Sequence, residues 1–96
     1  MNYHISKRAI ADLTEIWYYT AHKWSSIQAD KYYNELFESI EKLNLNFEIT
    51  KPADNIKFGY RKLKVNSHFI YFTKSKNGII EIKRILHQKM DVEKHL

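Results

Sequence analysis

The apolar positions in the first part of the chain recur at intervals of three and four residues, which is the spacing of one helix face. Starting from Ala9, they fall at Ile10, Leu13, Trp17, Ala21 and Trp24. Ser6 precedes this run, and its hydroxyl is suited to accept a hydrogen bond from a free amide of the first turn. We therefore predict a helix over about residues 7–23, preceded by a short strand at residues 3–5.

A second helical pattern begins at Ser25, whose spacing to Gln28 is that of a capping box. Its apolar positions are Ala29, Tyr32, Tyr33, Leu36, Phe37, Ile40, Leu43 and Phe47. This stripe predicts a helix of about five turns that pairs with the first one in an antiparallel hairpin. Helical spacing assigns most aromatic residues of both helices to the hairpin core. They would otherwise be platforms on which bases of single-stranded nucleic acid stack.

The period changes to two beyond a loop that Pro52 and Gly59 delimit. On one predicted strand the residues alternate, with Arg61, Leu63 and Val65 on one side and Lys62 and Lys64 on the other. Residues 68–73 are apolar on both faces, which is typical of a central strand. Asn77-Gly78 predicts a two-residue hairpin turn into a third strand at residues 79–87.

The predicted order of elements is β-α-α-β-β-β, followed by a tail at residues 89–96 that forms a helical turn or crosses the sheet. A helical hairpin and a strand meander each have one apolar face to bury. The economical arrangement is a single α+β domain over residues 1–96, with the hairpin packed on one face of a small antiparallel sheet. We expect the first strand to join that sheet at an edge.

The composition limits the compartment and the chemistry. The chain has 96 residues and no cysteine, which excludes disulfides, thiolate metal sites and cysteine nucleophiles. No apolar run approaches the ~18 residues of a membrane span, and the N-terminus has no apolar signal core. We therefore expect a cytoplasmic protein that does not contact the membrane.

Charge is distributed unevenly along the chain. Residues 1–50 hold five Lys/Arg and seven Asp/Glu, whereas residues 51–96 hold eleven Lys/Arg and four Asp/Glu. The second half therefore carries a net charge of +7 and the first half −2. A basic half is typical of a protein with an anionic partner, such as nucleic acid or an acidic peptide, although a solvated basic surface has the same signature.

Few catalytic patterns fit this sequence. No Gly-x-Ser-x-Gly nucleophile elbow occurs, and the only two glycines form neither a phosphate-binding loop nor a dinucleotide fingerprint. Most acidic residues fall at solvent-facing helix positions. Of the five histidines, His68 and His87 are placed to approach each other across neighbouring strands. No pair has the helical spacing of a metal site, so we expect neither a metal ion nor a cofactor.

Metal-free RNA cleavage is the chemistry that the basic half permits, because it needs cations for the phosphate and an acid–base group. The candidates are Arg61, Lys62, Lys64, Lys83, Arg84 and His87. Arg84 interrupts the apolar alternation of its strand. A guanidinium there implies either a groove on that face or a structural partner such as a carboxylate.

Several segments, taken in order, resemble the ParE-type toxins of the RelE/ParE superfamily. They are Ala11-Asp12-Leu13 with Ile16-Trp17 and Tyr19-Thr20, Trp24 before Gln28-Ala29-Asp30 and Tyr32, Lys51-Pro52, Gly59-Tyr60-Arg61-Lys62-Leu63, His68-Phe69-Ile70-Tyr71-Phe72, Arg84-Ile85-Leu86-His87, Met90-Asp91 and His95-Leu96. The resemblance covers nearly the whole chain, and the superfamily's fold has the order of elements predicted above.

The resemblance implies the toxin of a type II toxin–antitoxin system, which a ParD-like antitoxin neutralises in a hetero-oligomer. It implies a non-catalytic inhibitor of DNA gyrase that blocks replication, with no sequence-specific contact to nucleic acid. One alternative is a ribosome-dependent messenger-RNA endoribonuclease of the RelE type, with Arg61, Arg84 and His87 at its site. Another is an inactive module that only binds the antitoxin. The absence of a tyrosine after Arg84-Ile85-Leu86-His87 departs from the RelE pattern and favours the ParE branch.

On this interpretation the basic sheet face and the tail bind the target or the antitoxin through one shared groove. Arg84 and His87 would shape the groove and three lysines would steer the partner. The expected contact residues are Arg61, Lys62, Lys64, Lys83, Arg84, His87, Met90, Asp91, His95 and Leu96.

Overall fold

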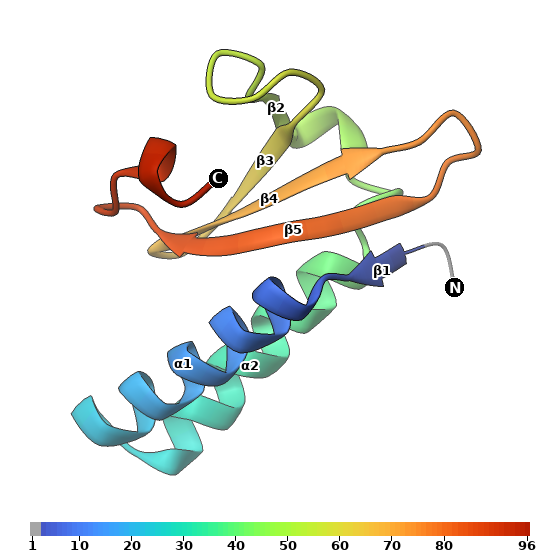
Figure 1. Ribbon diagram of the computed structural model, residues 1–96. Helices are drawn as coiled ribbons and strands as arrows, with labels where there is room; N and C mark the ends of the chain where they lie inside the picture. Colours follow the sequence, from blue (N-terminus) through green and yellow to red (C-terminus); the bar gives the residue numbers. More distant parts are fainter. Residues whose placement is uncertain (1–2) are drawn as a thin grey trace.

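The structure is a computed structural model that describes residues 3–96, and it places two helices against one face of a five-stranded sheet (Figure 1). Its elements are β1 (Tyr3–Ile5), α1 (Lys7–Lys23), α2 (Ser26–Glu41), the 3-10 turn η1 (Phe47–Ile49), β2 (Lys51–Pro52), β3 (Arg61–Val65), β4 (His68–Lys74), β5 (Ile80–His87) and the 3-10 turn η2 (Val92–Lys94). The strand order is β1-β5-β4-β3-β2. The α+β class, the helical hairpin and the edge position of the first strand are confirmed.

Two features of the sheet differ from the prediction. The sheet is mixed, because β1 runs parallel to β5 and all other neighbours are antiparallel. A short strand, β2, also pairs with the start of β3 in a segment predicted to be loop. The pairing of β1 with β5 follows from the topology. The helical hairpin carries the chain from β1 to the opposite edge of the sheet, and the strands β3, β4 and β5 then return strand by strand until β5 lies beside β1.

The helices begin where their caps predict. Ser6 accepts from the amide of Ala9 at 3.0 Å, and Ser25 accepts from that of Gln28 at 3.1 Å. The predicted end of α1 at Lys23 is confirmed, whereas the predicted extension of α2 to Phe47 is wrong. Beyond Glu41 the chain passes through turns into η1. Two asparagines in this segment are poor helix formers, and the turns let Phe47 pack on the core from outside the helix.

The connection between β4 and β5 is also longer than predicted. It spans residues 75–79 and is closed by a bond of 2.9 Å from the amide of Ser75 to the carbonyl of Ile79. A two-residue turn of the Asn-Gly type needs a positive φ at both central residues. Here Gly78 has a φ of 80° and Asn77 does not share that conformation.

A bulge in β5 redirects the side chains of its second half. Tyr71 pairs with Arg84 and Phe72 pairs with Ile82, so Lys83 is an extra residue on β5. Before the bulge, Ile82 faces the helices; after it, Ile85 does so and Leu86 lies on the opposite face. Simple alternation predicts that Arg84 lies in the same row as Ile80 and Ile82, facing the helices. The bulge removes Arg84 from that row.

The sheet separates two apolar clusters. The larger one joins α1 and α2 to the helix-facing side of β3, β4 and β5, and includes Leu13, Leu36 and Phe72. The smaller one lies on the opposite, far face, where Val92 and Leu96 of the tail pack with Tyr71 and Leu86. Figure 1 shows the tail and the loop before β3 on this far side. The prediction that the tail crosses the sheet or forms a helical turn is confirmed.

The last turns of α1 reach beyond the sheet, and this changes the environment of their aromatic residues (Figure 1). All buried residues of α1 lie between Ala9 and Ile16. Tyr18, Tyr19 and Trp24 are 66%, 63% and 71% exposed, so their assignment to the hairpin core is wrong. The helix itself is confirmed, but its buried face is offset from the predicted apolar row, because Ile10 is 52% exposed whereas Ile16 is buried.

Candidate functional site

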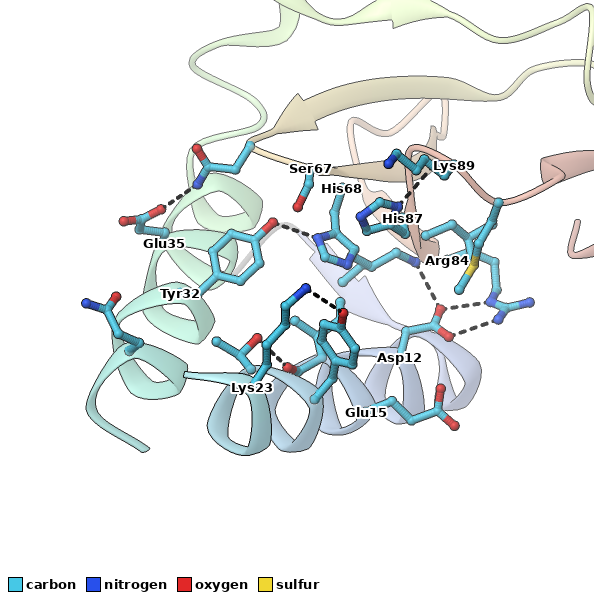
Figure 2. Close-up of a pocket in the computed structure, with 18 of the residues that line it drawn as sticks. Asp12, Glu15, Lys23, Tyr32, Glu35, Ser67, His68, Arg84, His87 and Lys89 are labelled. Carbon is cyan, nitrogen blue, oxygen red and sulfur yellow. Dashed lines mark hydrogen bonds and ion pairs between the residues drawn. The ribbon is translucent and has the colours of Figure 1, made fainter. Parts of the chain in front are cut away.

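A groove of about 1020 Å³ lies between the free end of the helical hairpin and the ends of β4 and β5 (Figure 2). Ile16 and Ile85 supply the apolar side chains of its floor, and the tail closes one side with Met90 and His95. The groove exists because the hairpin diverges from the sheet after Ile16, the last buried residue of α1.

A carboxylate–guanidinium pair forms one end of the groove. Asp12 is 8% exposed, and its two oxygens accept from Nε and Nη2 of Arg84 at 2.8 and 2.9 Å. The amide of Ile85 donates to the same carboxylate at 2.9 Å, and Nη1 of Arg84 donates to the carbonyl of His95 at 2.7 Å. The hydrogen bond to Asp12 raises the pKa of Arg84, so the guanidinium remains charged. Arg84 is thus a structural cation paired with a carboxylate, which was one of its two sequence interpretations.

Inside the groove, a tyrosine and a histidine are hydrogen-bonded to each other. The hydroxyl of Tyr32 lies 2.6 Å from Nδ1 of His68 and 3.0 Å from the carbonyl of Val65. Both bonds form together only if Tyr32 donates to Val65 and His68 donates from Nδ1. Burial, together with the neighbouring His87, lowers the pKa of His68 to about 4, and burial raises the pKa of Tyr32. Both groups are therefore neutral at physiological pH.

The two histidines that the sequence places on neighbouring strands do meet. His68 and His87 are directly opposite each other on β4 and β5, with ring centroids 5.2 Å apart and ring planes at 84°. Nδ1 of His87 accepts from the amide of Lys89 at 3.1 Å. Figure 2 shows both rings at the floor of the groove, between Tyr32 and the Asp12–Arg84 pair.

Exposed aromatic and cationic side chains form the outer rim. Tyr19 and Trp24 come from the end of α1, and Lys23 lies against Tyr19, with Nζ 3.3 Å from its hydroxyl and 5.6 Å from its ring centroid. Lys31 and Lys89 line the groove from α2 and the tail. An apolar floor with such a rim is suited to a peptide segment that carries apolar anchors and acidic flanks.

The structure brings only part of the predicted contact set into the groove. Arg84, His87, Met90 and His95 line it. Asp91 is exposed at the start of η2, and Leu96 packs on the far-face cluster. The four remaining cations lie elsewhere, so the structure does not form one shared groove from the whole set.

Each of those four cations has its own place on the sheet. Arg61 donates to Oγ1 and the carbonyl of Thr50, both at 2.9 Å. Lys62 is on the far face, with Nζ 4.9 Å from the ring centroid of Phe69, and Lys64 is exposed. Lys83, the extra residue of the bulge, pairs with Glu81 at 2.6 Å. Arg61, Arg84 and His87 therefore do not converge on one phosphate-sized site.

Several groove residues carry little signal in the sequence. Asp12 sits at a position where the helical pattern predicts a solvated acid, and its burial contradicts that expectation. Tyr32 and Trp24 both fit the apolar stripes of their helices. The stripes therefore do not indicate that the Tyr32 hydroxyl is hydrogen-bonded in the groove or that Trp24 is exposed. The one available signal was Arg84, because an interrupted apolar row implied a partner that had to be found elsewhere in the chain.

Within residues 3–96, no group of three or more His, Asp or Glu side chains is arranged so that it could hold a metal ion. In the same part of the chain, neither helix has the length and apolarity needed to cross a bilayer.

Comparisons with known proteins agree on one family. Residues 3–92 match the model of the ParE toxin of the type II toxin–antitoxin system parDE. The chain is 39% identical over 94 residues to Toxin ParE1 of Mycobacterium tuberculosis, covering 98% of this chain and 96% of that protein. It is 37% identical over 95 residues to Toxin ParE1 of Caulobacter vibrioides, with the same coverage. A solved structure, the chromosomal ParDE TA system from P. aeruginosa, contains a chain with the same fold. The TM-score is 0.76 at 21% identity, covering 91% of this chain and 95% of that one.

Proposed function

The chain belongs to the ParE toxin family of parDE type II toxin–antitoxin systems, and from this premise we propose that it arrests growth by inhibiting DNA gyrase and is held inactive by a ParD-like antitoxin. The proposed mode of action is binding without chemistry of its own. We propose that the toxin acts in the cytoplasm, where replication takes place.

The groove is the observation that supports an antitoxin partner. It is large enough for a peptide segment, and its apolar floor between the hairpin and the strand ends is open to solvent. Trp24 and Tyr19 at its rim are large side chains of the kind that dominate binding energies at interfaces. Lys23, Lys31 and Lys89 around the groove would attract an acidic segment and accelerate its association.

The antitoxin part of the proposal is tested by matched substitutions of two exposed aromatic residues. Trp24 lines the groove and is 71% exposed, whereas Phe58 is 91% exposed and lies outside it. Neither side chain is in the core, so both variants should fold. We expect Trp24→Ala to weaken binding of the co-expressed antitoxin at least about tenfold, a typical loss at an interface anchor. Phe58→Ala should bind as the wild type does. Equal affinities for both variants would place the antitoxin elsewhere.

The gyrase part is tested with purified components. The toxin, freed from its antitoxin, should inhibit supercoiling by gyrase and trap cleaved DNA. Failure of both effects at excess toxin would refute gyrase as the target. In cells that express the toxin without its antitoxin, codon-positioned cuts in translated messages would instead indicate the RelE-type alternative. Harmless overexpression would indicate an inactive binding module.

A further inference from the structure

The paired histidines at the groove floor have a geometry that neither antitoxin nor gyrase binding explains. We propose that His68 and His87 together bind one divalent transition-metal ion of the Zn²⁺, Ni²⁺ or Cu²⁺ class. This inference concerns the chain alone and does not depend on the proposed function.

The backbone places the two side chains as close as two strands allow. The amide of Gln88 donates to the carbonyl of Ser67 at 2.8 Å, just outside the pair of His68 and His87. This bond makes the histidines a non-hydrogen-bonded pair of the antiparallel ladder, in which facing side chains are closest.

The separation of the rings fits coordination of a shared ion. With a metal–nitrogen distance of about 2.05 Å and about 1.1 Å from nitrogen to ring centre, an ion lies about 3.2 Å from each centroid. A tetrahedral angle at the ion then separates the centroids by about 5.2 Å. The observed separation is 5.2 Å.

Each ring has one nitrogen bound to the chain and one that remains for a ligand. Nδ1 of His68 is engaged with Tyr32, and Nδ1 of His87 with the amide of Lys89. Nε2 of neither ring has a hydrogen-bond partner among residues 3–96, and both residues line the groove (Figure 2). Tyr32 orients His68 from behind, as outer hydrogen-bond partners of metal-binding histidines do.

Binding requires one local change, which supplies a signature. A neutral His87 that coordinates through Nε2 carries its proton on Nδ1 and no longer accepts from the amide of Lys89. Because Lys89 is exposed, water can replace this acceptor. No third His, Asp or Glu of residues 3–96 completes the site, so water fills the remaining positions. Imidazole ligands also exclude Mg²⁺ and Ca²⁺ from the expected occupants.

Zn²⁺ titration of the untagged full chain, followed by NMR of histidine side chains and backbone amides, tests the proposal. We expect the Nε2 signals of His68 and His87 to shift together with the Lys89 amide, and Mg²⁺ to have no effect. His87→Gln should weaken binding at least about tenfold, and Tyr32→Phe by about tenfold, the lower end for an outer-shell partner. His22→Gln removes an exposed histidine outside the groove and should leave binding unchanged.

The backbone spectrum of each variant establishes that it is folded. Unchanged histidine signals at millimolar Zn²⁺ would overturn the proposal, and so would equal affinity in the wild type and His87→Gln. Either result would mean that the two rings only pack against each other.

Discussion

At the scale of single residues, Asp12 connects α1 to β5 and, through Arg84, to the tail, and no sequence pattern indicates these contacts. Its carboxylate accepts from the side chain of Arg84 and from the amide of Ile85, and Arg84 in turn holds the carbonyl of His95. One side chain of α1 therefore positions the second half of β5 and the end of the tail. The sequence predicted that Arg84 needs a partner, but the identity of that partner depends on packing between residues 72 positions apart.

Replacing Asp12 with Asn should be among the most destabilising changes in the chain. It removes the charge that compensates a guanidinium only 12% exposed, and breaking such a buried pair costs about 3 kcal/mol. Denaturant unfolding should show this loss as a lower midpoint. Glu38→Gln, at an exposed position on α2, should change stability by less than about 0.5 kcal/mol. Similar midpoints for both variants would contradict the structural role of the pair.

His68 should make stability depend on pH. Its pKa of about 4 in the folded protein lies below the ordinary 6.5, because burial and His87 disfavour the charged ring, while Asp12 acts in the opposite direction. The unfolded chain therefore binds the proton more readily. The contribution of His68 is fully present above pH 6.5 and is lost as the pH falls toward 4.

The measurement is the free energy of unfolding across this pH range. In His68→Asn the decline toward acidic pH should be shallower than in the wild type, because the group responsible is gone. His22→Asn, at an exposed position, should retain the wild-type slope. A wild-type slope in His68→Asn would assign the acid sensitivity to other groups.

At the scale of elements, local signals located the boundaries where a cap or a turn residue determines them. The bounds of α1 and the central position of β4 are read from the sequence, since Ser6 and the apolar run of β4 are local features. The bulge at Lys83 has no such signal. It arises where β5 passes from its pairing with β1 to its contact with Asp12, so it depends on tertiary structure. Sequence alternation alone therefore misplaces Arg84 and Leu86.

The two serine caps should differ in their effect on stability. The Ser6 hydroxyl accepts from Ala9 and also donates to the carbonyl of Lys83 at 3.0 Å, whereas among the described residues the Ser25 hydroxyl makes only its cap bond, in an exposed turn. We expect Ser6→Ala to cost about 2 kcal/mol and Ser25→Ala about 1 kcal/mol. Thermal unfolding of the two variants side by side measures the difference. Equal losses would show that the bond to the bulge contributes nothing.

At the scale of the whole molecule, the uneven charge of the sequence does not become one basic face. Arg61, Lys62 and Lys83 belong to three separate surroundings, and the groove carries acids as well as bases. The total charge of the half-chain follows from composition, but the distribution of that charge over the two faces and the edges of the sheet depends on strand register and on the bulge. The groove itself arises from the divergence of two layers, which no single segment encodes.

The tail should stabilise the molecule through the far face. Deleting residues 92–96 removes Val92 and Leu96 from the cluster with Tyr71 and Leu86, and it removes the carbonyl that Arg84 binds. The lost apolar burial predicts a decrease of about 1–3 kcal/mol in the free energy of unfolding. Urea unfolding and binding of a hydrophobic dye should both report the change, and the exposed substitution Glu93→Gln should alter neither. An unchanged midpoint after the deletion would mean that the tail does not cover this face.

The contact between Asp12 and the amide of Ile85 also bears on self-association. Within residues 3–96, the outer margin of β5 is paired by β1 only at Ile80–Ile82, and margins left unpaired are where copies of a protein join into aggregates. Here the carboxylate occupies a main-chain donor that an incoming strand would need. A side chain that stabilises the fold thus also makes this margin a poor template for a second molecule.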